Sequence, residues 1–357
     1  MTMRTVLQRT AAVLALLAAL LLFAWTGRST SVGSAAGRAG GPPRVALFVN
    51  GTLGDKSFYD AAARGLARAA ATGGVRARVI EGGNDPTRWE AALTDLVDSG
   101  DFDAVVTGTF TMVGLVEKLA AAYPAARFIV FDASVDFARC RCRNVHAMRF
   151  RQAEAAYLAG HLAARLAGVD APTVGAIGGV QIPVIDDFLL GYSAGAQAAR
   201  PGLRVLRQYA NSFSDPATAK EIAKAMYGQG AAVVFQVAGG SGQGVIEAAA
   251  EAGRWVIGVD SDQYLLYKDS HPERAARIVS SVMKNVDVAI ERALGELAAG
   301  SLRWGDNVSL GLAEGGVGLA TGAPGWLALP PVVVDELQAL QAGIVAGRVA
   351  VPSTLAR

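Results

Sequence analysis

Short apolar runs alternate with helix-like segments along this chain from Arg44 onward, and the alternation restarts about halfway. The first half contains the runs "RVALFV", "RARVI", "DAVVTG" and "RFIVFDAS". One intervening helix is well marked: Asp85 can cap it, Pro86 suits its first turn, and Trp89 opens its apolar stripe. Because strands that alternate with helices form parallel sheets covered on both faces, the pattern predicts an α/β fold.

The second half repeats this arrangement after the helix-like stretch "RQAEAAYLAGHLAARLAG". Its apolar runs are "TVGAIGG", "RVLRQYA", "AAVVFQVAGG" and "WVIGVDSD". The chain has 357 residues, of which 52% are hydrophobic and 18% charged, which is enough for two medium domains with their own cores. We therefore expect two similar α/β halves with a boundary near Met148 to Gln152.

Residues 1–36 have the pattern of a secretory signal peptide. Arg4 and Arg9 precede an uninterrupted apolar run from Ala11 to Trp25, and small residues follow it. A bilayer-spanning helix needs about 20 apolar residues, so this run of 15 favours an export signal. An uncleaved N-terminal anchor remains the alternative. Residues 37–43 form a linker, and no cysteine follows the apolar run to carry a lipid.

Charge and cysteine content exclude several classes of protein. Without residues 1–36 the chain has 30 basic and 31 acidic residues, so no basic surface indicates a nucleic-acid partner. Cys140 and Cys142 stand two positions apart in "CRC", a spacing that makes a disulfide tight, and their oxidation state stays open. Two cysteines alone make a weak metal site, so we expect none, and we expect no cofactor.

The ends of the predicted strands are the expected ligand site, because ligands of open parallel sheets bind beyond the carboxyl ends of the strands. These ends are rich in glycine, carboxylates and aromatic residues, and two such edges facing each other would enclose a cleft. The loop "GTLGDKS" lacks the spacing of a phosphate-binding loop, and "HExxH" does not occur. The sequence therefore favours a binding protein over an enzyme.

Several stretches together resemble the basic membrane lipoprotein family, the solute-binding components of ABC importers that include purine nucleoside receptors. They keep the family's order between about residues 44 and 320. The stretches are "GDKSFYD", "FIVFDAS", "RQAEAAYLAGHLAA", "VGAIGGVQIPVIDDFLLGYSAGAQA", "NSFSDPATAKEIAKAMYGQGAAVVFQVAGGSGQGVIEAA", "VIGVDSDQ" and "VSSVMKNVDVAI".

The resemblance implies a type I periplasmic-binding-protein fold, with two Rossmann-like lobes, each around a central parallel sheet, joined by three hinge crossings. The N-terminal lobe would comprise residues 44–147 plus about 283–300. The C-terminal lobe would comprise residues 148–281 plus about 303–357. A ligand would be trapped between the lobes by hinge closure.

The resemblance also implies roles for particular side chains. Phe58 and Phe188 are similar to the two walls of a slot that stacks on a flat base. Asp132 resembles the carboxylate on the base side, Asp260 the acceptor of ribose hydroxyls, and Lys284 the donor that accompanies Asp260.

Three further positions belong to the expected site. Gly239 resembles the glycine whose missing side chain lets the sugar approach the backbone. Asp55 either caps the following helix or touches the ligand. Tyr59 departs from the family, which commonly has asparagine there. An asparagine amide both donates to and accepts from a purine edge, so the exact ligand stays open.

We thus expect an exported, monomeric, periplasmic binding protein that delivers a nucleoside-like ligand to an ABC permease, without catalysis. The alternatives are a membrane-anchored ligand sensor, a receptor for a sugar or a flavin, and a nucleoside hydrolase. The permease and the affinity stay open.

Overall fold

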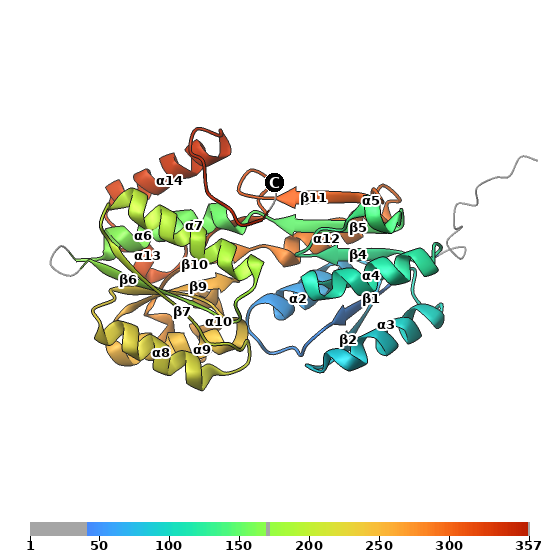
Figure 1. Ribbon diagram of the computed structural model, residues 1–357, viewed down its shortest axis with the longest axis horizontal. Coiled ribbons are helices and arrows are strands. Elements are labelled where there is room, and N and C mark those ends of the chain that lie inside the picture. Colours follow the sequence, from blue (N-terminus) through green and yellow to red (C-terminus); the bar gives the residue numbers. More distant parts are fainter. Residues whose placement is uncertain (1–40, 169–171, 356–357) are drawn as a thin grey trace, which may run out of the picture. The chain divides into compact units, whose positions relative to one another are not determined.

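The computed structural model describes residues 41–168 and 172–355 and contains two six-stranded sheets (Figure 1). The apolar run Ala11–Trp25 and the rest of the leader lie outside the described residues. Within the described residues, no helix is long and apolar enough to cross a membrane. Residues Pro42–Arg357 belong to one compact unit, within which the sheets define two lobes.

The first sheet has the order β11-β5-β4-β3-β1-β2, and all its pairings are parallel. Its strands are β1 (Arg44–Val49), β2 (Arg76–Glu81), β3 (Ala104–Gly108), β4 (Phe128–Phe131), β5 (Val145–Phe150) and β11 (Asp306–Leu310). The associated helices are α2 (Phe58–Ala71), η1 (Pro86–Arg88), α3 (Trp89–Asp98), α4 (Phe110–Ala122), α5 (Phe137–Cys140) and α12 (Val286–Ala298).

The second sheet has the equivalent order β12-β10-β9-β8-β6-β7. Its strands are β6 (Thr173–Gly178), β7 (Arg204–Tyr209), β8 (Val233–Val237), β9 (Trp255–Asp260), β10 (Ile278–Lys284) and β12 (Val317–Leu319). The remaining helices are α6 (Gln152–Leu166), α7 (Pro183–Ala199), α8 (Pro216–Gly228), η2 (Gly239–Ser241), α9 (Gly242–Ala252), α10 (Gln263–Tyr267), α11 (Pro272–Ala275), α13 (Pro324–Leu327) and α14 (Pro331–Val345).

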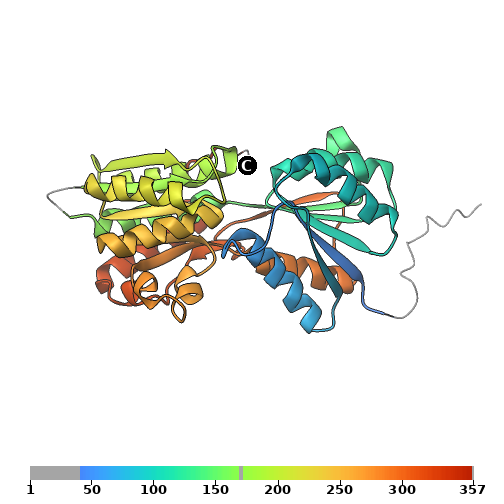
Figure 2. The ribbon, with the colours of Figure 1, turned by 90° about the horizontal axis from the view of Figure 1, so that it is seen from below.

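Alternating side chains bury both faces of the first sheet. Val45 and Leu47 of β1 belong to the same core as Leu66 of α2, whereas Ala46 and Phe48 pack in the core that contains Leu93 of α3. In Figure 2, α2 and α12 accordingly lie on one face of this sheet, and α3 and α4 on the other. The core on the α2 side continues into the second lobe, so one hydrophobic core contains buried residues of both lobes.

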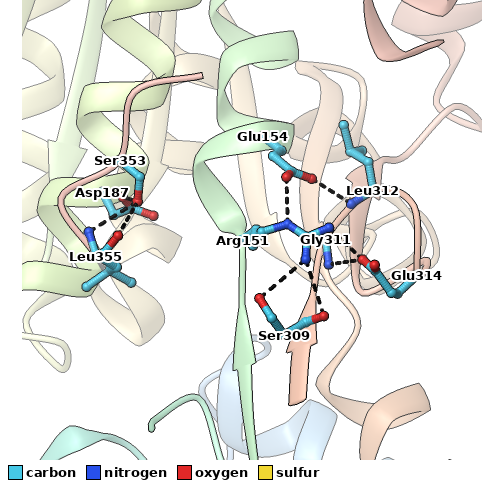
Figure 3. A network of polar contacts seen from close by, with 9 residues as sticks. All are labelled: Arg151, Glu154, Asp187, Ser309, Gly311, Leu312, Glu314, Ser353 and Leu355. Carbon is cyan, nitrogen blue, oxygen red and sulfur yellow. Dashed lines mark hydrogen bonds and ion pairs between the residues drawn. The ribbon is translucent and has the colours of Figure 1, made fainter. Parts of the chain in front are cut away.

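Three segments connect the lobes, which confirms the predicted type I arrangement. They run from β5 to α6, from β10 to α12, and from β11 to β12. Polar bonds tie them together. The Arg151 guanidinium bonds to Glu154 at 2.7 Å and to Glu314 at 2.6 Å, and the Asn285 amide donates to the Gly315 carbonyl at 2.8 Å. The Arg151 bonds are drawn in Figure 3.

The last strands differ from the sequence-based assignment. Residues 303–357 are predicted for the C-terminal lobe, but β11 within them pairs with β5 in the first sheet. It is a short edge strand with few apolar residues, so no local pattern marked it. The second sheet is not wholly parallel, because β12 returns from the first lobe and meets the outgoing β10 antiparallel.

Local features settle two smaller questions. Asp85 caps the 3-10 turn η1, because its side chain accepts from the backbone N–H of Thr87. Cys140 and Cys142, whose oxidation the sequence left open, form a disulfide at the end of α5.

Two glycines allow α6 and α7 to pack backbone to backbone. A Cβ on Gly195 would lie 1.9 Å from the carbonyl oxygen of Tyr157, and one on Gly160 would lie 1.9 Å from that of Tyr192. Because backbone atoms cannot move aside like the end of a flexible side chain, these helices require glycine at both positions.

We expect Gly195→Ala to lower the free energy of unfolding by about 2 kcal/mol or more, through overpacking between α6 and α7. Gly114→Ala is the matched control, since a Cβ on this exposed glycine of α4 meets nothing within 4 Å. The control should stabilise by up to about 1 kcal/mol through helix propensity. Urea unfolding measures both, and equal effects would contradict this description of the helix contact.

Candidate functional site

A cavity of about 530 Å³ lies at the carboxyl ends of the strands, lined by residues of both lobes. This volume is within the range of small-molecule sites. All eight residues predicted for the site line it; they are Asp55, Phe58, Tyr59, Asp132, Phe188, Gly239, Asp260 and Lys284. These residues lie close together because the carboxyl ends of the parallel strands lie at one edge of each sheet. That they bind a ligand stays a prediction.

The glycine-bearing loop before α2 is built around carboxylates. Asp55 accepts hydrogen bonds from the backbone N–H groups of Ser57, Tyr59 and Asp60, at 2.9, 2.9 and 3.2 Å. Asp60 in turn accepts from the N–H groups of Gly54 and Lys56, at 2.8 and 2.9 Å. The amides that a phosphate would need are thus already bonded to aspartates. Asp55 therefore satisfies amides in the first turn of α2, whose N-cap residue is Ser57, and burial raises the pKa of its carboxyl in spite of these amides.

The predicted aromatic walls both face the ammonium of Lys284. Its Nζ lies 5.4 Å from the ring centre of Phe58 and 5.2 Å from that of Phe188, within the range of cation–π attraction. Phe58 is half-buried, whereas Phe188 is only 1% exposed and packs near Phe235. Phe188 therefore serves the core of the second lobe and the cavity wall at once.

Asp132 and Asp260 occupy corresponding places in the two lobes. Asp132 follows β4 and Asp260 ends β9, the third strand from the corresponding edge in each sheet. Both have left-handed backbone, with φ of 57° and 63°. This conformation is uncommon for non-glycine residues and turns the chain sharply at the strand end. Two acidic side chains are thus held at the same edge of the cavity.

Their polar partners differ from the expectation. Lys284, predicted to accompany Asp260, forms its ion pair with Asp132, and the Nζ–Oδ1 distance is 2.6 Å. The reason is the crossing: β10 carries Lys284 out of the second lobe toward the first. Asp260 instead accepts a hydrogen bond from the Ser57 hydroxyl of the other lobe at 2.5 Å.

Burial dominates the electrostatics of these carboxyls. It raises the pKa of Asp260 to about 6, although Lys284 and the Ser57 hydroxyl act in the opposite direction. Burial also raises the pKa of Asp132, again against the effect of Lys284. With Asp55, three carboxyl groups line the cavity beside one ammonium. Burying an anion beside these carboxyl groups would be unfavourable.

The Tyr59 hydroxyl forms its hydrogen bonds with Asn50 of the same lobe. The hydroxyl lies 3.1 Å from the backbone oxygen of Asn50 and 3.2 Å from its Oδ1. Its ring occupies space left by Gly51, since a Cβ there would lie 2.7 Å from the ring edge. Burial raises the pKa of the phenol above its ordinary value. Tyr59 thus offers the cavity its ring, while its hydroxyl is engaged within the first lobe.

Glycines shape the opposite rim. Gly239 has a φ of 55°, in the left-handed region that favours glycine. A Cβ on the next residue, Gly240, would lie 3.0 Å from the backbone oxygen of Phe213 and 3.9 Å from the Cα of Asp55 in the other lobe. The two rims therefore approach each other closely at this point.

Several cavity residues were not predicted individually. Phe110 and Phe213 are 48% and 41% exposed, and Trp89, expected in the apolar stripe of its helix, donates from Nε1 to the Gly83 carbonyl at 2.9 Å. Phe110 lies just after β3, so its place near a strand end could have indicated that it lines the cavity. Phe213 follows an edge strand, and its local sequence "NSFSDP" does not show that it reaches the cavity.

Within residues 41–168 and 172–355, no group of three or more His, Cys, Asp or Glu side chains is placed to hold a metal ion. The three histidines do not line the cavity. The polar groups that do line it can donate and accept hydrogen bonds.

Comparisons with known proteins show similarity in family and fold. A family model described as "ABC transporter substrate-binding protein PnrA-like" matches residues 43–349. The ABC transporter nucleoside-binding protein BmpA of Lactococcus lactis is 34% identical over 254 residues, which cover 68% of this chain and 69% of that protein. Basic membrane protein D of Borreliella burgdorferi is 29% identical over 277 residues, covering 77% and 78%.

Solved structures are also similar. A solute-binding protein of an ABC transporter system from Aeropyrum pernix has a TM-score of 0.75 and 28% identity, covering 87% of this chain and 94% of that one. A solute-binding protein from Conexibacter woesei has a TM-score of 0.71 at 23% identity, covering 88% and 100%, and supports the fold alone.

Asp260→Asn tests the electrostatics. The folded-state pKa of about 6 lies above the ordinary 3.8. This carboxyl therefore contributes most to stability below about pH 4, and the contribution is lost as the pH rises through 6. Asparagine does not titrate. As the pH rises from 4 to 7.5, we expect the unfolding free energy of the variant to increase by about 2 kcal/mol relative to that of the wild type. Unfolding free energies across this range measure the gain, and parallel curves would contradict the assignment.

Proposed function

The chain belongs to the family of PnrA-like substrate-binding proteins of ABC transporters, and from this premise we propose that it binds a nucleoside between its lobes and delivers it to a membrane permease. The observation that carries the proposal is a buried pair of aspartates beside two aromatic rings in one cavity. Aromatic rings suit a flat base, and carboxylates suit the N–H and O–H groups of a base and a ribose.

Each part of a nucleoside has a proposed partner. Phe58 and Phe188 would enclose the base, and Asp132, with Lys284, would meet its polar edge. Asp260 would accept from ribose hydroxyls, because Ser57 supplies it with only one neutral donor. Gly239, which lines the cavity and has no side chain, would let the sugar approach the main chain. These roles are proposals that rest on lining positions and hydrogen-bonding capacity.

A phosphate group fits the cavity poorly. Three carboxyl groups face one ammonium, and the loop amides near the start of α2 are already bonded to Asp55 and Asp60. Bringing a phosphate here would bury like charges together. We therefore propose a nucleoside in preference to a nucleotide.

The protein would act by capture and release, without a chemical step. In support, the cavity combines hydrogen-bonding groups with aromatic rings. We further propose that it works outside the cytoplasmic membrane, as a monomer, after export by residues 1–36. Sequencing the N-terminus of the mature protein separates a cleaved signal from a retained anchor, and retention of Ala11–Trp25 would favour the anchored sensor.

We expect calorimetry to detect at least one purine or pyrimidine nucleoside binding at micromolar affinity or better. The panel includes free bases, sugars, riboflavin and the matching 5′-monophosphates. Because of the carboxyl groups, the monophosphate of the preferred nucleoside should bind at least about 100-fold more weakly, equivalent to roughly 3 kcal/mol. Binding of no nucleoside would contradict the proposal, and equal affinity for the monophosphate would contradict the electrostatic argument.

Substitutions at neighbouring aromatic positions test the stacking role. Phe58→Ala removes a proposed wall, and we expect it to weaken nucleoside binding by tenfold or more, about 1.4 kcal/mol. Tyr59→Phe keeps the ring and removes only the bonds to Asn50. It should change the dissociation constant by less than about threefold. A larger loss in Tyr59→Phe than in Phe58→Ala would show that the hydroxyl, and not the stack, dominates.

A further inference from the structure

The C-terminal tail after α14 returns to the beginning of α7 and bonds to a buried carboxylate there. The Ser353 hydroxyl donates to Oδ1 of Asp187 at 2.6 Å, and the backbone N–H of Thr354 donates to the same oxygen at 2.8 Å. The Thr354 hydroxyl lies 3.3 Å from this oxygen and 3.0 Å from the carbonyl oxygen of Pro183. Figure 3 shows the tail residues Ser353 and Leu355 beside Asp187.

Asp187 depends on these neutral donors. It is 1% exposed, and its second oxygen accepts from the amide of Gln152 at 2.8 Å. A buried carboxylate that loses its donors carries a large desolvation cost. The tail hydroxyls and N–H therefore make the buried position of Asp187 tolerable.

The beginning of α7, where the tail bonds to Asp187, also forms one wall of the cavity. Ile182, Val184, Ile185 and Phe188 line the cavity, and all lie within five residues of Asp187. The negative charge of Asp187 reaches the cavity as well, since it adds to burial in raising the pKa of Asp132.

Gln152, the other partner of Asp187, begins α6 directly after the first crossing. Its Nε2 is bonded to Asp187, while its Oε1 is buried without a partner among the described residues. Gln152 thus gives Asp187 one hydrogen-bond donor, and the tail supplies the others. The tail, the first crossing and the cavity wall consequently meet at one carboxylate.

We propose that the C-terminal tail is a positioning element for ligand binding: Ser353 and Thr354, through Asp187, hold the first turns of α7 so that Phe188 forms the cavity wall. The affinity part of this proposal rests on the proposed nucleoside-binding function. The positioning part concerns the ligand-free protein and is independent of it.

Hydrogen exchange of the full ligand-free chain tests the positioning part. Ser353→Ala/Thr354→Val removes both hydroxyls, and Ser353→Thr/Thr354→Ser is the matched control that keeps them. We expect amide exchange in residues 184–192 to rise about tenfold in the alanine/valine variant and to stay unchanged in the control. Exchange in α8 should stay unchanged in both. A chain ending at Pro352, which also loses the Thr354 N–H, should show a larger rise. Unchanged exchange in α7, or an equal rise throughout the second lobe, would overturn the proposal.

Calorimetry with the nucleoside that the wild type prefers tests the affinity part. We expect the alanine/valine variant to bind about tenfold more weakly and the hydroxyl-keeping control to bind like the wild type. In an Asp187→Leu background, which offers the tail no acceptor, the same tail change should alter affinity by less than twofold, because the tail acts through the carboxylate. An equal loss in both backgrounds would overturn this route. If the wild type binds no nucleoside, the proposed function fails, and hydrogen exchange still decides whether the tail positions α7.

Discussion

The arrangement of the cavity depends on one buried ammonium. Lys284 is 2% exposed and stands where β10 leaves the second lobe for the first. Its charge is tolerated because the Asp132 carboxylate lies 2.6 Å away and the rings of Phe58 and Phe188 face it. The same residue therefore neutralises one acid, contacts both proposed aromatic walls and joins a crossing to the first lobe.

Repetition of one sheet order explains why two acids meet there. Corresponding strands end at corresponding places, so Asp132 after β4 and Asp260 at the end of β9 occupy equivalent positions with left-handed backbone. Lys284 pairs with Asp132, which leaves Asp260 with the Ser57 hydroxyl and a raised pKa. The unequal pairing suits the proposed neutral ligand, with its hydrogen-bond donors, better than an anion.

The alternation of apolar runs and helices was sufficient to predict two α/β lobes, and the strand ends indicated where the cavity lies. Local patterns do not encode contacts between distant residues, which explains the differences. Lys284 and Asp132 are 152 positions apart. The engagement of the Tyr59 hydroxyl depends on Asn50 and on space at Gly51, and the exposed ring of Phe213 reaches the cavity through tertiary packing.

We propose that both lobes hold the same nucleoside. Hydrogen exchange with and without the preferred nucleoside tests it most directly, by following residues 51–60 of the first rim together with residues 183–188 and 239–244 of the second. The account predicts that exchange slows on both rims when the nucleoside is added. Protection of one rim alone, or unchanged exchange on both, would contradict it.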